Sequence, residues 1–170
     1  CLGDTFKTNF EKKSVCVLWT GQPCPDWSSS HQGRRPPGEE GKTGWQFVAQ
    51  AEKILEVDPH VCVIEMVPNA LQVNDGESVV KLMAKLRSRY DLHADIVKTA
   101  GHGDATARYR MIIIGFKKAT VGEAARDFKF PEYAYGETKY HTARDIAVED
   151  GEVPEAYWRD DKPPMLPWEE

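Results

Sequence analysis

Three short runs of β-branched and other apolar residues constrain the fold of this chain more than any other feature. They occupy residues 15–20, 60–66 and 111–116, and the last of them, M-I-I-I-G-F, is the most apolar. Short runs that are apolar throughout are typical of strands in a parallel sheet that is covered on both faces. We therefore predict three buried strands here, and we expect Trp19 and Trp45 to belong to the core.

The segments between these strands carry helical spacing. Apolar residues recur every three or four positions over 45–57, where Pro59 ends the pattern, and again over 77–90. This spacing predicts two amphipathic helices. A fourth strand is predicted over 92–98. Because alternating strands and helices define the α/β class, the expected fold is an α/β, mostly parallel sheet.

The last two predicted strands are connected differently. The turn between Lys98 and Tyr109 is too short for a helical crossover, so these strands should pair antiparallel. Beyond residue 120 the regular pattern fades into a charged segment with five prolines: Pro131, Pro154, Pro163, Pro164 and Pro167. The sequence thus predicts a core over residues 1–120 and an irregular acidic extension over 121–170.

Composition limits the class of protein. The chain has 170 residues, of which 41% are hydrophobic, as expected for one globular domain. No run of about 18 apolar residues occurs, so neither a membrane span nor a membrane partner is predicted. The net charge of −5 is concentrated in residues 145–170, which hold nine acidic and two basic residues. An acidic tail on a near-neutral body neither supports nor excludes a nucleic-acid partner.

The four cysteines differ in their surroundings. Cys1, Cys16, Cys24 and Cys62 show no C-x-x-C spacing, and no histidines cluster near them, which argues against a zinc site. Cys16 and Cys62 lie inside apolar runs, so we predict buried free thiols, which suit a reducing intracellular compartment. Cys24 lies among turn-forming residues in a long loop after the first strand.

Polar groups gather where the predicted strands end. The loop after the first strand carries Cys24, the second strand nears its end at Glu65, and Arg108 and Arg110 stand at the start of the last strand. Ligands of open α/β sheets bind beyond the carboxyl ends of the strands. A thiol and a carboxylate at adjacent strand ends are therefore expected to face one pocket.

These segments resemble the motifs of the cytosine carbon-5 DNA methyltransferase family, in the same order and spacing. Residues 21–28, G-Q-P-C-P-D-W-S, are similar to the catalytic loop G-x-P-C-Q-x-F-S of that family. Residues 65–67 resemble its E-N-V motif, and residues 106–110 resemble its Q-x-R-x-R motif. Residues 2–4, L-G-D, are similar to a short G-D element that closes over the cofactor adenine.

The resemblance implies a methyltransferase-type Rossmann-like sheet and methyl transfer from S-adenosyl-L-methionine to carbon 5 of cytosine in DNA. Cys24 would attack ring carbon 6 as a thiolate and form a covalent adduct. Glu65 would hydrogen-bond ring nitrogen 3 and the exocyclic amine. Arg110, with Arg108 nearby, would bind the base carbonyl oxygen and orient Glu65 or the loop of Cys24.

The resemblance also implies the binding partners. Asp4 and Pro23 would contact the cofactor, S-adenosyl-L-methionine. The target cytosine must leave the double-stranded DNA to be reached, and the long loop after Trp27 would close over it. Candidate contacts to the nucleic acid lie in that loop: Ser28, Arg34, Arg35 and Lys42.

The chain departs from the family pattern at four positions. Pro25 replaces the Gln after the nucleophile, and Thr43 stands where the catalytic loop usually has Arg. Met66 replaces the Asn of E-N-V, which is expected to loosen the packing of that loop. Thr106 replaces the Gln of Q-x-R-x-R.

The resemblance further implies that parts of the family's catalytic unit lie outside this chain. Its Gly-rich first motif would precede residue 1, and most of its target-recognition domain would follow residue 170. We therefore expect a sheet that is incomplete at its N-terminal end, little or no activity of the isolated chain, and a complementing methyltransferase segment as a partner.

Two other functions stay open at this point. One is a non-catalytic or split module that binds nucleic acid or a partner chain, and the other is an enzyme that acts on tRNA cytosine. The expected location is intracellular: the nucleus in a eukaryote, and the cytoplasm or nucleoid in a bacterium or virus.

Overall fold

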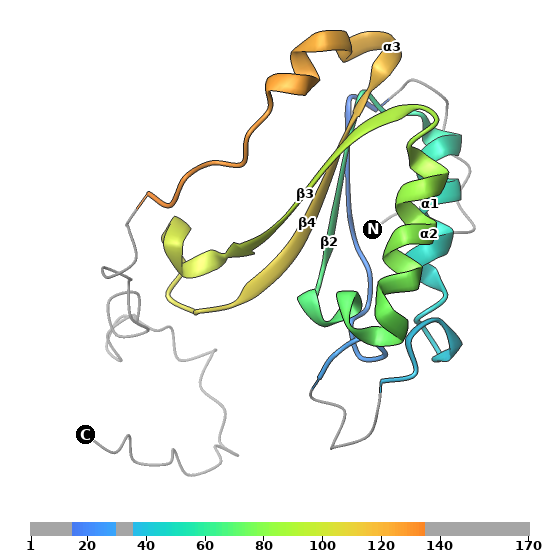
Figure 1. Ribbon diagram of the computed structural model, residues 1–170, viewed down its shortest axis with the longest axis vertical. Helices are drawn as coiled ribbons and strands as arrows, with labels where there is room; N and C mark the ends of the chain where they lie inside the picture. Colours follow the sequence, from blue (N-terminus) through green and yellow to red (C-terminus); the bar gives the residue numbers. More distant parts are fainter. Residues whose placement is uncertain (1–14, 30–35, 135–170) are drawn as a thin grey trace, which may run out of the picture.

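The described part of the chain comprises residues 15–29 and 36–134 in the computed structural model (Figure 1). Its helices and strands, in chain order, are β1 (Val17–Gly21), α1 (Gln46–Val57), β2 (Val61–Met66), α2 (Glu77–Leu86), β3 (Tyr90–Lys98), β4 (Tyr109–Lys117) and the short α3 (Lys118–Val121). Within these residues, no helix is both long enough and apolar enough to cross a membrane.

The four strands form one sheet in the order β1-β2-β4-β3. β1 and β2 run parallel, with Val17 opposite Val61 and Gly21 opposite Glu65. β4 lies antiparallel between β2 and β3, so β1, β2 and β3 all point the same way. The α/β class and the antiparallel pairing of the last two strands are thus confirmed.

The second helix is shorter than predicted. α2 ends at Leu86, and β3 begins at Tyr90, within the segment predicted to be helical. Tyr90 is buried, pairs with Lys117 in the β3–β4 ladder, and donates a hydrogen bond from its hydroxyl to the Pro59 carbonyl oxygen at 2.9 Å. These long-range contacts outweigh the local helical pattern.

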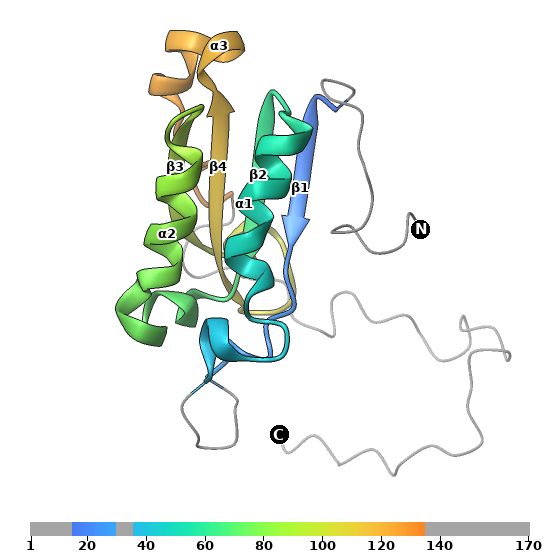
Figure 2. The ribbon, with the colours of Figure 1, turned by 90° about the vertical axis from the view of Figure 1, so that its right-hand side faces the viewer.

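Both main helices cover the same face of the sheet (Figures 1 and 2). At one end of the opposite face, Phe128 packs against His93 and Phe116. On β1, however, Val17 is 58% exposed and Trp19 is 65% exposed, because their side chains point away from the helices. The prediction of a sheet covered on both faces, with Trp19 in the core, is therefore wrong for the described residues.

Two further residues predicted to be buried are exposed. Cys16 immediately precedes β1, whose edge is open in the described part of the chain, and Trp45 precedes α1. Both lie just outside a regular element, where the apolar pattern of the element no longer fixes the direction of a side chain. The buried state predicted for Cys62 is confirmed, and burial raises the pKa of its thiol to about 11.

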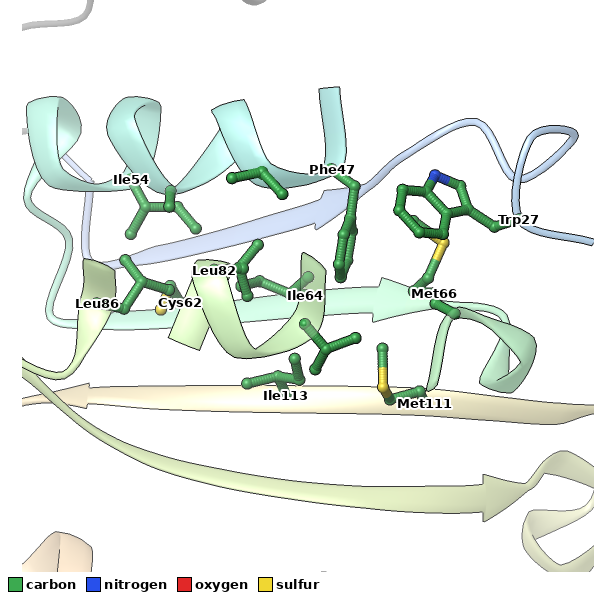
Figure 3. Close-up of a cluster of buried hydrophobic side chains, with 14 of the residues drawn as sticks. Trp27, Phe47, Ile54, Cys62, Ile64, Met66, Leu82, Leu86, Met111 and Ile113 are labelled. Atoms are coloured by element: carbon green, nitrogen blue, oxygen red, sulfur yellow. The ribbon is translucent and has the colours of Figure 1, made fainter. Parts of the chain in front are cut away.

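One core lies between the helices and the sheet (Figure 3). Burial of a single large apolar side chain contributes about 1.5–3 kcal/mol to stability, so the helices are held mainly by this face. The core side chains come from both helices and the two central strands: Phe47 and Ile54 on α1, Leu82 and Leu86 on α2, Cys62, Ile64 and Met66 on β2, and Met111 and Ile113 on β4.

Trp27 anchors the loop of Cys24 to this core. Its side chain is fully buried, and its ring lies 5.3 Å from that of Phe47, at an interplanar angle of 59° (Figure 3). The indole Nε1 of Trp27 is buried without a hydrogen-bond partner among the described residues. An unsatisfied buried donor costs about 1–3 kcal/mol, so the shape of this ring stabilises the loop while its N–H opposes burial.

This contrast predicts how two substitutions of Trp27 will behave. Trp27→Phe removes the unsatisfied donor and keeps an aromatic ring, so the free energy of unfolding should stay within about 1 kcal/mol of the parent. Trp27→Ala should lower it by about 3–5 kcal/mol, because it leaves a cavity. Urea titrations of the two variants and the parent measure both effects. Equal destabilisation by Phe and Ala would mean that the indole N–H contributes to stability.

Candidate active site

The predicted catalytic residues gather at one end of the sheet, which we call the catalytic edge. The carboxyl ends of β1, β2 and β3 and the start of β4 meet at this edge (Figure 1). Cys24 follows β1, Glu65 is the last residue but one of β2, and Arg110 is the second residue of β4. The register of the strands thus brings together side chains that are far apart in the sequence.

Glu65 and Arg110 form an ion pair. The Nε atom of Arg110 lies 2.5 Å from Oε1 of Glu65, and their side chains are 17% and 31% exposed, respectively. Such a short, partly buried pair fixes the direction of both side chains more than an exposed pair does. The ion pair brings Arg110 and Glu65 together, and the role of Arg110 in orienting Glu65 stays a prediction.

Gly21 leaves room for the carboxylate on the other side. It stands opposite Glu65 in the β1–β2 ladder, and a Cβ atom at residue 21 would lie only 3.3 Å from Oε2 of Glu65. The carboxylate is therefore bounded by β1 on one side and by Arg110 on the other. Sequence reasoning read Gly21 only as part of a motif and did not foresee this contact.

Arg108 is placed differently from Arg110. Its side chain is exposed, and its backbone closes the turn between β3 and β4 through a 2.8 Å hydrogen bond from the Thr99 N–H. In the same turn, Thr106 donates hydrogen bonds from its hydroxyl and backbone N–H to Asp104. These bonds, aided by the charge of Arg108, lower the pKa of Asp104. Arg108 thus does not share the ion pair with Glu65.

Cys24 is exposed at the start of a tight turn. The Trp27 N–H donates a 3.0 Å hydrogen bond to the Cys24 carbonyl oxygen, which closes the turn. Cys24 lies three residues beyond Gly21, the ladder partner of Glu65, and three residues of chain reach at most about 11 Å. The ladder therefore holds the thiol and the carboxylate at neighbouring strand ends.

Other segments hold this turn from two sides. The Asp26 carboxylate accepts two hydrogen bonds from Thr43, one from the backbone N–H and one from the hydroxyl, each 2.7 Å long. Asn69, in the loop after β2, donates a 2.8 Å hydrogen bond from its side-chain amide to the Trp27 carbonyl oxygen. In the sequence, Thr43 stood out only as a departure from the family pattern, and these contacts of Asp26 and Asn69 were not predicted.

The remaining predicted site residues are described only in part. Pro23 and Lys42 are exposed, and Ser28 is half-buried. Asp4, Arg34 and Arg35 lie outside the described residues, so their roles stay predictions. Among the residues that the structure describes, no group of three or more His, Cys, Asp or Glu side chains could hold a metal ion.

The chain belongs to the C-5 cytosine-specific DNA methylase family, whose model matches residues 3–163. The type II methyltransferase M.Sau96I of Staphylococcus aureus is 25% identical over 123 residues, which make up 72% of this chain and 28% of that protein.

A crystal structure from E. coli, described as a DNA modification methyltransferase encoded within a prophage, shares the fold. It aligns with a TM-score of 0.54 at 18% identity, and the match covers 80% of this chain and 36% of that chain. The chain thus spans only about a third of the length of these relatives, and it shares with them the methyltransferase-type Rossmann-like fold.

Proposed function

We propose that this chain carries the catalytic centre of an enzyme that methylates carbon 5 of cytosine in DNA, with Cys24 as the nucleophile. The observation that carries the proposal is the ion pair of Glu65 with Arg110, held beside the exposed turn of Cys24. A thiol, a carboxylate and a guanidinium at one sheet edge are the groups that addition to a cytosine ring requires.

The reaction would begin with the Cys24 thiolate. Its sulfur forms a bond to carbon 6 of the cytosine, and the electron pair of the C5–C6 double bond moves toward carbon 5. Glu65 holds a proton at ring nitrogen 3 and so stabilises the charge that develops in the ring. After carbon 5 has gained the methyl group, water accepts the proton that carbon 5 loses, the C6–S bond breaks to restore the thiolate and the aromatic ring, and the proton at nitrogen 3 returns to Glu65.

S-Adenosyl-L-methionine, the methyl donor of the family, supplies an electrophilic methyl group when it is bound. Pro23, exposed at the end of β1, is the described residue that would contact it, and Asp4 is the second proposed contact. The chemistry of these residues allows contact with a nucleoside but does not form a complete binding site. The rest of that site would come from segments outside this chain.

The proposed nucleic acid is double-stranded DNA with an extruded cytosine. Lys42 is exposed in the segment before α1, and Ser28 follows the turn of Cys24. These side chains, with Arg34 and Arg35, would contact phosphates and fix the position of the duplex.

Such a substrate places the protein inside the cell. Residues 1–120 would form the catalytic core, and residues 121–170 would lead toward the target-recognition region.

Activity would require a complementing methyltransferase segment. In the described part of the chain, β1 has β2 as its one neighbouring strand, so its other edge is open. Val17 and Trp19 are largely exposed beside that edge, whereas native sheets normally protect an apolar edge strand. We therefore expect the isolated chain to transfer no methyl groups.

Methyl incorporation tests the proposal. Two proteins are compared. One is the 170-residue chain, and the other, which we call the joined protein, is the same chain joined to flanking methyltransferase segments. Each is incubated with radiolabelled S-adenosyl-L-methionine and either duplex DNA or tRNA. We expect the joined protein to label DNA and the isolated chain to label neither nucleic acid. Labelling of tRNA alone would identify a tRNA enzyme, and no labelling by the joined protein would favour a non-catalytic binding module.

A further inference from the structure

We infer that Asp26, Thr43 and Asn69 are positioning residues that fix the Cys24 turn relative to Glu65. This inference rests on the proposed function, because it assigns a role in presenting the nucleophile. The three side chains come from the turn itself, from the segment before α1 and from the loop after β2. None of them belongs to the groups proposed to contact the cytosine ring.

Asp26 fastens the turn to the segment 38–44, which we call the neck. The Asp26 side chain is only 8% exposed, and its Oδ2 atom accepts both hydrogen bonds from Thr43 at 2.7 Å. The Asp26 carbonyl oxygen also accepts a 2.8 Å hydrogen bond from the Gly38 N–H. Hydrogen bonds to a carboxylate are stronger than those between neutral groups, so a residue two positions after Cys24 is held at three points.

The neck is packed so closely that two of its positions admit only glycine. A Cβ atom at Gly41 would lie 2.2 Å from Cγ of Asp26, and one at Gly44 would lie 1.6 Å from the Gly38 carbonyl oxygen. Close backbone approach of this kind leaves Asp26 little freedom to move. The Cys24 turn therefore packs against the closely packed neck and is not held by β1 alone.

Asn69 fastens the same turn to the strand that carries Glu65. Its side-chain amide donates a 2.8 Å hydrogen bond to the Trp27 carbonyl oxygen, and it lies four residues after Glu65. Met66, which occupies the position of Asn in the E-N-V motif, is instead buried in the core. Asn69 thus supplies an amide contact between the two loops three residues after Met66.

The two contacts together define the separation of sulfur and carboxylate. One links the turn to the neck, and the other links it to the end of β2, so loss of either allows Cys24 to shift while Glu65 stays with Arg110. A misplacement of about 1 Å can slow a reaction about a hundredfold. Thr43 stands where the family pattern has an Arg, so its hydroxyl bond to Asp26 comes from a residue at which this chain departs from that pattern.

Adduct formation tests the inference. In the joined protein, with S-adenosyl-L-methionine present, a duplex containing 5-fluorocytosine traps Cys24, because fluorine replaces the hydrogen on carbon 5, no proton can leave after methylation, and the C6–S bond therefore persists. We expect Thr43→Val and Asn69→Ala to slow trapping about tenfold each, while the Kd for the same duplex changes less than about twofold. Thr43→Ser, which keeps the hydroxyl, should trap at the parental rate, and so should Glu40→Gln, an exposed residue of the neck.

Two results would overturn the inference. One is parental trapping rates in both Thr43→Val and Asn69→Ala, and the other is a loss of duplex affinity that accounts for the whole loss of rate. If Thr43→Val does not fold, as judged by urea titration, Asp26→Asn keeps the shape of the side chain while it weakens the same contact, and it should slow trapping in the same way.

A second measurement separates this inference from the proposed function. If the parent forms no adduct at all, the proposed function fails, and the positioning role is then read from the alkylation of Cys24 by iodoacetamide in the 170-residue chain. Mass spectrometry compares its rate with that of Cys16, an exposed thiol outside the site. Thr43→Val should change the ratio of the two rates at least about threefold, and an unchanged ratio would refute the positioning role.

Discussion

Replacement of Cys24 by serine is expected to abolish methyl transfer in the joined protein, with a loss of about ten-thousandfold or more in single-turnover rate. Only an anionic sulfur adds readily to carbon 6, and a serine hydroxyl is neither acidic nor nucleophilic enough to replace it. Losses of this size are typical when a covalent nucleophile is removed. Because the side chains are nearly equal in size and Cys24 is exposed, the fold and the affinity for DNA should not change.

Cys16 offers a matched control for this substitution. It is also an exposed cysteine, but it lies before β1, at the opposite end of that strand from Cys24. Cys16→Ser should therefore keep the parental rate of methyl transfer and the adduct that resists denaturation with 5-fluorocytosine DNA. Methyl transfer by Cys24→Ser at more than a few per cent of the parental rate would exclude Cys24 as the nucleophile.

Replacement of Glu65 by glutamine is expected to slow adduct formation by about a hundredfold to a thousandfold. Glutamine has the same shape, but it cannot hold a proton for ring nitrogen 3, and it leaves the Arg110 guanidinium without its anionic partner. The rate of trapping on 5-fluorocytosine DNA measures this loss directly. Since the Cys24 turn is held by contacts other than Glu65, the accessibility of its thiol to iodoacetamide should remain parental.

Glu52 provides the comparison for Glu65→Gln. It forms a 2.7 Å ion pair with Lys85 between the two helices, away from the catalytic edge. Glu52→Gln removes one charge from a salt bridge and should leave the trapping rate within about twofold of the parent, because exposed pairs contribute little. If the Glu65→Gln variant forms the adduct as fast as the Glu52→Gln variant, then the ion pair of Glu65 with Arg110 stabilises the sheet and takes no part in the reaction.

The sequence was sufficient to predict most of the strands and both helices. The runs around Val63 and Ile113 are apolar without alternation, which leaves few other places for them than the centre of a sheet. The position of β4 between β2 and β3 was not predictable, because a short turn fixes only that β3 and β4 are antiparallel neighbours. The exposure of Trp19 was not predicted. An apolar pattern shows which strand residues would gain from burial, but it does not show whether another part of the chain packs over them.

The candidate site divides in a similar way. Cys24, Glu65 and Arg110 were predicted as site residues because they stand in recognisable motifs, and their catalytic roles stay proposals. Asp26 and Asn69 were not, because each acts through a contact with a residue 17 or 42 positions away in the sequence, and such contacts appear only once the strands are aligned.

The close approach of Gly21 and Glu65 makes these two positions mutually dependent. A Cβ atom at residue 21 would lie 3.3 Å from Oε2 of Glu65, so the carboxylate would have to shift by a few tenths of an ångström. Any variant that shortens the acid at residue 65 would relieve this crowding, and any variant that enlarges residue 21 would displace the acid. An engineer who wishes to redesign either residue must therefore treat them as a single choice, although 43 intervening residues separate them along the chain.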